Sequence, residues 1–415
     1  MVPKPSGPGR RDPEVPVVAN GAEVFTLGVR PGAVRLVFLS HSYFPALGGS
    51  ERFVQGLAEG AARHGFTTTV VTRQDPGTAA REEVGGVTVV RLPMRNLAGF
   101  HVPRRYRPTV RELRPDLVHL IGNRVWAADY YLPYAGSFGW AQVMTGIGFY
   151  QYEMHRRWWD RWYFERYLPR RIGRLDRYVA CTPHERDQLL SWGVAPGRLA
   201  VVPLGIPLGE FEGRSSEPGP VRDRWGLGTP FVALYAGGYY ENKRVDRLVR
   251  SVAATGGRWG LVAIGRDVPS SPYSRSVVEA LARALGARTR FQEAVARPEF
   301  LDGLAASDVA VLGSSYEGFG LFLLEAMAMG RPFVAYRTGV APELAASGAG
   351  FAVATEAEFT DALRQLEDAS LRSRMGARGR ELVANYSVDR EVLDYLALYE
   401  QTVAGRRPGG AGAVP

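Results

Sequence analysis

The sequence predicts an α/β protein made of two doubly wound halves that follow one another along the chain. A chain of 415 residues is too long for one ordinary hydrophobic core and suits two domains. Short apolar runs alternate with amphipathic segments of helical period along most of the chain, as in proteins with parallel sheets. Near residue 210 glycine, proline and charged residues accumulate without any period, and we place the domain boundary there.

The first half of the chain begins with a βαβ unit. Residues 1–33 are rich in proline, glycine and charge, and we expect them to form a disordered arm. The run RLVFLS then predicts a buried strand, ERFVQGLAEGAARHG a helix, and TTTVVTR a second, parallel strand. The same alternation continues through VTVVRL, DLVHLIG, DRYVACT and RLAVVPLG. We therefore assign residues 34–208 to an N-terminal Rossmann-like domain.

The second half repeats the pattern after the segment Pro203–Gly228, which is the best linker candidate. Five strand-like runs alternate there with helical segments, namely FVALYAGG, WGLVAIG, TRFQEAV, DVAVLGSS and RPFVAY. We assign residues 209–385 to a C-terminal Rossmann-like domain, 386–404 to a final helix rich in leucine and tyrosine, and 405–415 to a disordered tail.

The charge of the chain favours an anionic partner. Its 51 basic and 42 acidic residues give a net charge of +9. The usual nucleic-acid motifs are not found in the sequence, and we expect no nucleic-acid partner. Six scattered histidines and the single Cys181 provide neither metal-ligand spacing nor a disulfide, so we expect no metal site. The sequence contains no bilayer-length apolar run and no signal peptide, which favours a cytoplasmic location.

Glycine pairs follow the first strand of each half, where ligands of open parallel sheets bind. In the first half, Gly48 and Gly49 precede a helix, so that a phosphate or a sugar can approach the backbone; a tight turn is the ordinary alternative. In the second half, Gly237 and Gly238 end a strand shortly before Lys243. Neither pair forms the G-x-G-x-x-G fingerprint of an NAD-dependent oxidoreductase.

Lys243 is unusual because the chain has 2 lysines against 49 arginines. A solvated surface lysine is the ordinary explanation for such a residue. A compact ammonium kept at the mouth of a strand-to-helix turn, however, suits the neutralisation of a phosphate. We favour this second interpretation.

Two glutamates follow the strand DVAVLGSS. Glu317 precedes Gly318, Phe319 and Gly320, and Glu325 lies eight residues further on, slightly more than two helical turns. Both carboxylates can then face one cleft. Glu325 also interrupts the apolar runs LFLL and AMAM, where a buried carboxylate needs a hydrogen-bonding partner such as a ribose hydroxyl.

Together these motifs resemble the retaining family 4 glycosyltransferases of GT-B fold, also described as glycosyl transferases group 1. The resemblance spans roughly residues 35–400 and rests on EGFG with its second glutamate, the first glycine pair, the lysine before VDRLV, and APEL after RTG. It implies two Rossmann-like domains that face each other across a cleft, the N-terminal one on the acceptor side and the C-terminal one on the donor side. A C-terminal helix is expected to cross back to the N-terminal domain.

The resemblance also assigns roles to residues. Glu325 is expected to bind the donor ribose, Glu317 the donor sugar, and Lys243 the diphosphate, while Gly48 and Gly49 close over the donor. Glu317 and Lys243 are the expected catalytic residues. The full set of expected donor-binding residues is Gly48, Gly49, Gly237, Gly238, Lys243, Gly265, Glu317, Gly318, Phe319, Gly320, Leu321 and Glu325.

The implied reaction moves a hexose-type sugar, with retention of configuration, from a UDP-, GDP- or ADP-sugar to a hydroxyl of a glycan, a lipid-linked or a small-molecule acceptor. A cell-envelope polysaccharide is one such glycan. The chain contains no D-x-D motif, and we expect a metal-independent reaction without a cofactor. Two departures from the family pattern support a second hypothesis: Gly238 replaces an arginine at the diphosphate, and Ile147 replaces a histidine near the sugar. A GT-B-like protein that binds a nucleotide or a partner without transfer is therefore the alternative.

A segment rich in arginine and aromatic residues, 153–174, marks the acceptor or membrane side. Trp158, Trp159 and Trp162, with Tyr150 just before the segment, suit an anionic lipid surface or a lipid-linked acceptor, because Trp and Tyr favour the interface and Arg the head groups. A partly buried helix that covers the N-terminal sheet explains the same pattern. Both interpretations stay open, and the first adds a peripheral position on the inner face of the membrane.

Overall fold

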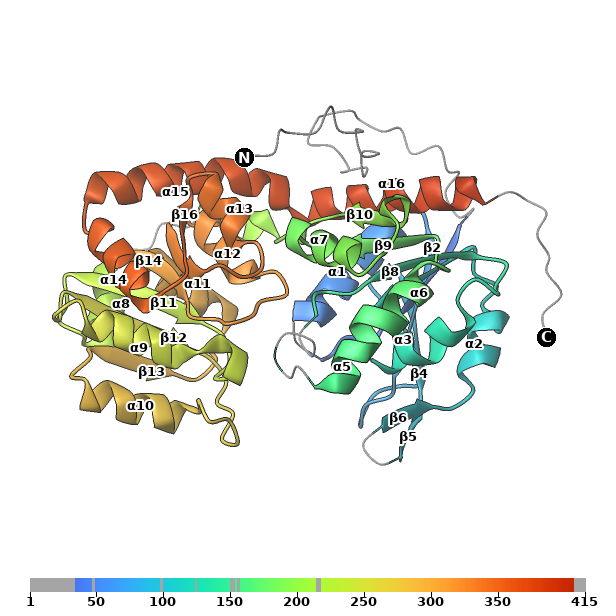
Figure 1. Ribbon diagram of the computed structural model, residues 1–415, viewed down its shortest axis with the longest axis horizontal. Coiled ribbons are helices and arrows are strands. Elements are labelled where there is room, and N and C mark those ends of the chain that lie inside the picture. Colours follow the sequence, from blue (N-terminus) through green and yellow to red (C-terminus); the bar gives the residue numbers. More distant parts are fainter. Residues whose placement is uncertain are drawn as a thin grey trace, which may run out of the picture.

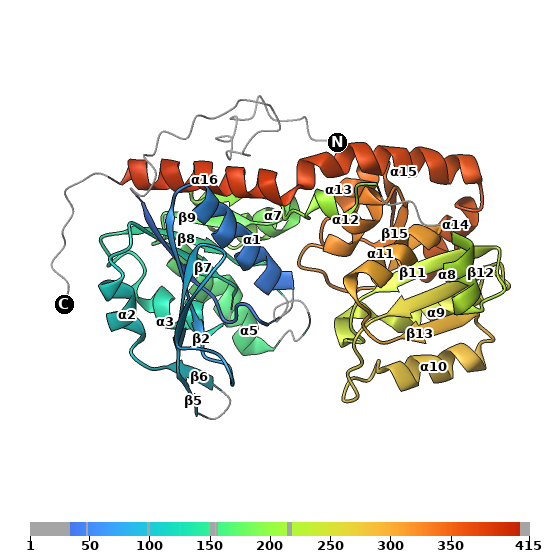
Figure 2. The ribbon, with the colours of Figure 1, turned by 180° about the vertical axis from the view of Figure 1, so that it is seen from behind.

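The chain folds into two α/β domains, each built around one large sheet (Figures 1 and 2). The computed structural model describes residues 34–46, 49–97, 100–123, 125–149, 154, 157–213 and 218–406. The predicted fold class is confirmed, because each half contains an open, mainly parallel sheet with helices on its faces.

The N-terminal sheet has eight strands, of which only β3 is antiparallel to its neighbour. In spatial order they are β10 (Leu199–Val201), β9 (Arg177–Ala180), β8 (Ala141–Thr145), β7 (Leu117–Ile121), β1 (Arg35–Leu39), β2 (Thr67–Arg73), β4 (Val87–Leu92) and β3 (Arg81–Val84). The central strands β1, β7 and β8 are almost entirely buried, which is why they read as continuous apolar runs.

Helices cover both faces of this sheet. They are α1 (Gly49–Arg63), α2 (Tyr106–Glu112), α3 (Trp126–Tyr131), α5 (Trp158–Trp162), α6 (Leu168–Ile172) and α7 (Pro183–Ser191). Two features were not predicted from the sequence: a hairpin of β5 (Met94–Leu97) and β6 (Phe100–Pro103), and a π-helical turn, Tyr163–Tyr167, that joins α5 to α6.

The C-terminal sheet has six parallel strands. In spatial order they are β13 (Thr289–Gln292), β12 (Trp259–Ile264), β11 (Phe231–Ala236), β14 (Val309–Leu312), β15 (Phe333–Tyr336) and β16 (Gly350–Val353). The helices of this domain are α8 (Pro218–Trp225), α9 (Val245–Ala253), α10 (Arg275–Ala284), α11 (Arg297–Ala306), α12 (Leu321–Ala328), α13 (Ala341–Ala346), α14 (Glu356–Gln365) and α15 (Ala369–Val383).

The interpretation of Pro203–Gly228 as a linker is wrong for its second part. Helix α8 lies there and packs against α11, with Val221 and Trp225 buried. The segment opens with prolines, which suit the first turn of a helix, but its buried residues are too few to reveal a helical period. The first part of the segment does connect the domains: residues 202–207 have no regular structure apart from the bridge at Ile206, and the 3₁₀ turn Leu208–Glu210 follows.

The last helix, α16 (Val388–Gly405), returns to the N-terminal domain, as the resemblance implies (Figures 1 and 2). It packs on α1 and β8, and a side chain at Gly60 would collide with Val392 at 2.5 Å. The tail was expected to begin at residue 405, but Gly405 is still helical and the Arg406 guanidinium pairs with Asp176 at 3.0 Å. The expected disordered arm, 1–33, and residues 407–415 lie outside the described residues.

The two domains are joined at a narrow hinge. Ile206 pairs with Ser387 in a parallel bridge, so the outgoing and the returning chain run side by side. Among the described residues, no helix combines the length and apolar character that crossing a bilayer requires. The hinge places the carboxyl ends of both parallel sheets around one space between the domains.

Candidate active site in the interdomain cleft

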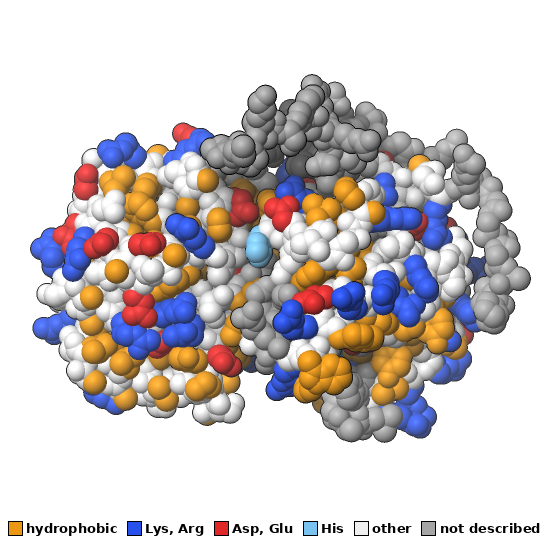
Figure 3. Space-filling view, viewed as in Figure 1, with side chains coloured by type: hydrophobic (Ala, Val, Ile, Leu, Met, Phe, Trp, Pro, Cys, Tyr) orange, Lys and Arg blue, Asp and Glu red, His pale blue; other side chains and the backbone are white. Residues whose placement is uncertain are grey.

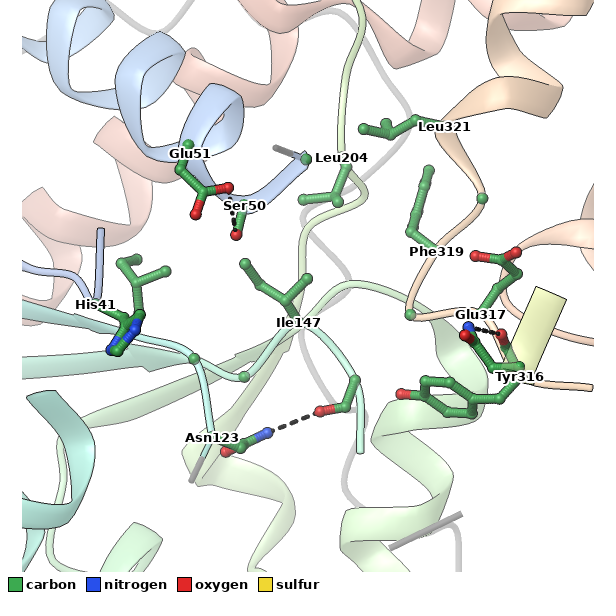
Figure 4. A pocket seen from close by; sticks show the side chains of 18 of the residues that line it. His41, Ser50, Glu51, Asn123, Ile147, Leu204, Tyr316, Glu317, Phe319 and Leu321 are labelled. Carbon is green, nitrogen blue, oxygen red and sulfur yellow. Dashed lines mark hydrogen bonds between the residues drawn. The ribbon is translucent and has the colours of Figure 1, made fainter. Parts of the chain in front are cut away.

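A cavity of about 560 Å³ lies between the domains, where strands of both sheets end (Figure 4). Its N-terminal wall contains the residues after β1, β7 and β8, including Ser40, Asn123 and Ile147. Its C-terminal wall contains Lys243 and the segment from Tyr316 to Phe322. A ligand in this cavity would therefore touch both domains.

Lys243 and Glu317 meet in this cavity. The Lys243 ammonium lies 2.8 Å from both carboxylate oxygens of Glu317. The Ser314 hydroxyl donates to Oε1 of the same carboxylate at 2.5 Å. Lys243 is fixed by the short 3₁₀ turn Glu241–Lys243 and Glu317 by the loop after β14. The predicted convergence of an ammonium and a carboxylate is present, and a diphosphate would compete with Glu317 for the ammonium.

The N-terminus of α12 opens onto the same cavity. Gly320 caps this helix with φ 106°, a left-handed conformation that favours glycine. The Phe319 carbonyl accepts a hydrogen bond from the Val340 N–H at 2.8 Å, which fixes the loop. Leu321 and Phe322 line the cavity, and the first N–H groups of a helix have no partners within the helix. The site thus offers backbone donors and a helix dipole beside Lys243.

Glu325 lies in an adjoining cavity of about 450 Å³ and not with Lys243 and Glu317. The two cavities share Leu204 and Leu321 in their walls, so they adjoin along the cleft. The structure supplies a partner other than a ribose: Arg297 Nη1 lies 2.6 Å from Glu325 Oε1. Burial raises the pKa of Glu325, and the Arg297 guanidinium opposes this rise. A ribose could bind Glu325 only beside or in place of this arginine.

The expected glycines divide into two groups. Gly49 lines the cavity at the start of α1, whereas Gly48 lies outside the described residues. Gly237, Gly238 and Gly265 do not line it. Close packing also requires glycine there, because a side chain on Gly265 would meet the Gly237 carbonyl at 1.8 Å and one on Gly238 would meet the Tyr240 ring at 2.4 Å.

The three tryptophans of the arginine-rich segment lie outside both cavities. Trp158, Trp159 and Trp162 are 75%, 41% and 54% exposed. The same segment also covers the N-terminal sheet, because Phe164 and Leu168 are fully buried. Part of the segment is therefore a buried covering helix, while the lipid interpretation of its exposed tryptophans stays a prediction, and Tyr150 lies outside the described residues.

Sequence reasoning missed a carboxylate on the N-terminal wall. Glu51, in the first turn of α1, accepts hydrogen bonds from the Ser42 hydroxyl and, at 2.9 Å, from the Ser50 hydroxyl. Burial raises the pKa of Glu51, but these hydrogen bonds together with a backbone N–H outweigh it and lower the pKa. Polar residues directly after the strand RLVFL were the available signal for this wall.

The domains touch at one edge of the cavity. The Phe149 N–H donates a hydrogen bond to the Tyr316 hydroxyl, and Gly318 lies against the carbonyl of Ile147. A side chain on Gly148 would meet the Cα of Gly318 at 2.9 Å. The loop after β8 and the loop after β14 are therefore in van der Waals contact.

Groups of three or more His, Cys, Asp or Glu side chains that could hold a metal ion are not found among the described residues. The cations near the cleft are instead side chains such as Lys243 and Arg297. Any ligand with a diphosphate would meet these and the helix N-terminus.

Both halves of the chain match known families. Residues 47–210 match Glycosyltransferase Family 4, and residues 221–382 match Glycosyl transferases group 1. A D-inositol 3-phosphate glycosyltransferase of Kineococcus radiotolerans is 31% identical over 260 residues, which cover 57% of this chain and 59% of the relative. The chain spans 58–61% of the length of this relative, of a second D-inositol 3-phosphate glycosyltransferase from Actinosynnema mirum and of an MMP alpha-(1->4)-mannosyltransferase from Mycolicibacterium hassiacum.

Solved structures share the fold over most of the chain. Sucrose-phosphate synthase of Thermosynechococcus elongatus superposes with a TM-score of 0.73 at 22% identity, covering 89% of this chain and 99% of that one. HepE of Anabaena, solved in complex with UDP and glucose, gives a TM-score of 0.71 at 17% identity, covering 89% and 100%. These similarities concern the arrangement of the two domains.

Proposed function

We propose, from the premise that this chain belongs to the GT-B glycosyltransferases of the family 4 and group 1 type, that it transfers a hexose-type sugar from a nucleoside diphosphate sugar to a hydroxyl acceptor. The acceptor is a glycan, a lipid-linked sugar or a small molecule. Transfer retains the anomeric configuration and needs no metal ion. The protein acts in the cytoplasm.

The observation that carries this proposal is the meeting of Lys243, Glu317 and the N-terminus of α12 in one interdomain cavity. The leaving group of the reaction is a nucleoside diphosphate, and negative charge develops on it as the sugar departs. An ammonium and the free N–H groups of a helix stabilise that charge without a metal ion. In this arrangement Glu317 contacts the sugar and releases Lys243 to the diphosphate.

The adjoining cavity suits the nucleoside of the same donor. A donor with its diphosphate at the start of α12 would extend along the helix to Glu325, one turn further in. Glu325 would then exchange Arg297 for the ribose hydroxyls. HepE of Anabaena binds UDP with a related fold, which makes a uridine donor a natural first probe.

The direct test measures release of nucleoside diphosphate from UDP-glucose, GDP-mannose and ADP-glucose, with and without EDTA. We expect release from at least one donor, unchanged by EDTA, and a raised melting temperature with that donor. An anomer-resolved product analysis then reports retention or inversion. Release that EDTA abolishes would contradict metal independence, and an inverted product would contradict retention.

A second candidate, binding without transfer, is favoured by one observation. At Gly238, where the family usually places an arginine, the Tyr240 ring fills the space of a side chain. Lys243 would therefore bind the diphosphate without a neighbouring arginine at this position. A donor that raises the melting temperature but releases no nucleoside diphosphate would support this candidate over transfer.

We also propose that the tryptophan face of α5 rests on an anionic lipid surface. Arg157 lies 5.4 Å above the Trp159 ring, and Arg161, on the same helix, is 61% exposed. Figure 3 shows arginine and hydrophobic side chains side by side over this part of the N-terminal domain. Indole rings prefer the interface and guanidinium groups the anionic head groups.

Alanine at Trp158, Trp159 and Trp162 together should lower flotation with liposomes of phosphatidylglycerol and phosphatidylcholine at least fivefold, because three exposed indoles are lost. A matched control removes three exposed apolar side chains elsewhere, Val277, Leu285 and Leu393. The control should float as the wild type does. Equal flotation of both triple variants would contradict the assignment of this face.

A further inference from the structure

Ile147 has a backbone conformation that its side chain disfavours. Its φ is 54°, in the left-handed region, where a β-branched residue is a clear outlier. Such outliers persist only where the surrounding structure enforces them, and they concentrate at functional sites. Ile147 lies in the loop between β8 and the cavity.

Hydrogen bonds to Gly148, the residue that follows Ile147, hold this conformation. The Asn123 amide donates to the Gly148 carbonyl at 3.0 Å, and the Gly148 N–H lies 3.4 Å from Glu185 Oε1. A side chain on Gly146 would collide with the Tyr178 hydroxyl at 1.8 Å, so the backbone is packed tightly there. The loop therefore has no freedom to turn the Ile147 side chain away.

The Ile147 side chain consequently points into the middle of the cavity (Figure 4). Leu204 and Phe319 lie on the side of Ile147 towards the C-terminal domain, and the three side chains together form an apolar wall. A side chain built on Gly318 would lie 3.9 Å from Cγ2 of Ile147, so this wall adjoins the loop that carries Glu317. Polar residues also line the cavity: Ser50 and Glu51 lie beside Ile147 in Figure 4, and Asn123 donates to the carbonyl of Gly148.

A sugar held at Glu317 would place part of its ring against this wall. A hydroxyl that faces hydrocarbon loses its hydrogen bonds to water and gains none. A hydrogen or a methyl group at the same position is buried favourably. An apolar pocket of this kind discriminates against one added hydroxyl by about tenfold to a hundredfold.

We propose that Ile147 determines donor specificity and that the donor carries a deoxyhexose, whose deoxygenated carbon packs on Ile147. This inference rests on the proposed function, because it places the donor sugar beside Glu317. It adds the class of sugar and the residue that selects it.

The test compares UDP-glucose with its 2-, 3-, 4- and 6-deoxy analogues, or GDP-mannose with its deoxy analogues where the guanosine donor is the one turned over. Because water can replace the unidentified acceptor, kcat/KM for nucleoside diphosphate release by hydrolysis is the readout. In the wild type, one deoxy donor should exceed the parent hexose at least tenfold. Ile147→Val and Ile147→Thr form a matched pair, since both are β-branched and of similar volume, and Thr adds one hydroxyl.

The expected result is that Ile147→Thr lowers the preference for the deoxy donor at least fivefold relative to Ile147→Val. Equal ratios in the two variants, or a parent hexose that matches every deoxy donor, would overturn the inference and leave the transferase assignment intact. A wild type that releases nucleoside diphosphate from no donor would refute the proposed function, and the inference with it.

Discussion

Replacing Lys243 by alanine should lower kcat/KM for nucleoside diphosphate release about a thousandfold. Among the described residues that line the cavity, Lys243 is the one lysine or arginine, and its ammonium lies 2.8 Å from Glu317. Without it, Glu317 would be left as a largely buried carboxylate beside the departing diphosphate. The Glu317 carboxylate would then repel the negative charge that develops on the diphosphate. Steady-state release with the donor found in the panel measures the effect.

A matched control removes a cation of the same domain away from the cleft. Arg258 pairs with Glu367 at 2.6 Å and is 56% exposed, so Arg258→Ala should leave kcat/KM unchanged. Melting temperatures of both variants show whether the fold is kept. Lys243→Ala with wild-type turnover would show that the ammonium is a structural partner of Glu317 and not a catalytic group.

Glu325→Gln provides a contrasting effect at the other end of the proposed donor site. If Glu325 binds the ribose, this variant should mainly raise KM for the donor, because the interaction is present in the ground state and the transition state alike. Lys243→Ala should lower kcat as well. The split between KM and kcat therefore separates nucleoside binding from stabilisation of the leaving group.

The sequence predicted the parts of the site that belong to single strand ends. Lys243 and Glu317 were expected at the ends of β11 and β14, and adjacent parallel strands bring such ends together. The alternation of strand-like and helical segments was sufficient to predict the two sheets. The unusual use of lysine singled out Lys243 among 51 basic residues.

The sequence could not show which distant side chains pair. Arg297 begins α11, 28 residues before Glu325, and nothing in the local pattern indicates that it neutralises this carboxylate. The hydrophobic flanks of Glu325 correctly implied a buried acid but not its partner. The three glycines, Gly237, Gly238 and Gly265, do not line the interdomain cavity, and close packing is a second reason for glycine there; their contact with a donor stays a prediction.

The hinge depends on a second buried carboxylate that no motif marked. Glu391, in α16, accepts a hydrogen bond from the Gly205 N–H at 2.9 Å through Oε2. Its Oε1 is buried and has no hydrogen-bond partner among the described residues. Burial, followed by the nearby charge of Asp394, raises the pKa of Glu391 to about 8, against the hydrogen bond from Gly205. The folded protein therefore favours the protonated acid.

This raised pKa makes stability fall with pH. In the unfolded chain the carboxyl has the ordinary glutamate pKa of 4.5, so the stabilisation is fully present below about pH 4.5 and is lost as pH rises towards 8. The difference of several pKa units corresponds to about 3 kcal/mol between pH 5 and pH 8. Glu185, whose pKa burial raises to about 7, adds a loss of the same sign at slightly lower pH.

Glu391→Gln should raise the melting temperature by about 3 to 6 °C at pH 8 and leave it nearly unchanged at pH 5, because glutamine keeps an acceptor for Gly205 but carries no titrating charge. Thermal melting of both proteins across this range measures the difference, from which Glu185 and the other shared groups cancel. Glu381→Gln, at an exposed carboxylate paired with Arg378, is the matched control and should show no such trend. A difference between wild type and Glu391→Gln that does not grow with pH would mean that Glu391 is ionised in the folded hinge. The unpartnered Oε1 would then have to be hydrated, and the two connecting segments would be held by charge and not by a neutral hydrogen bond.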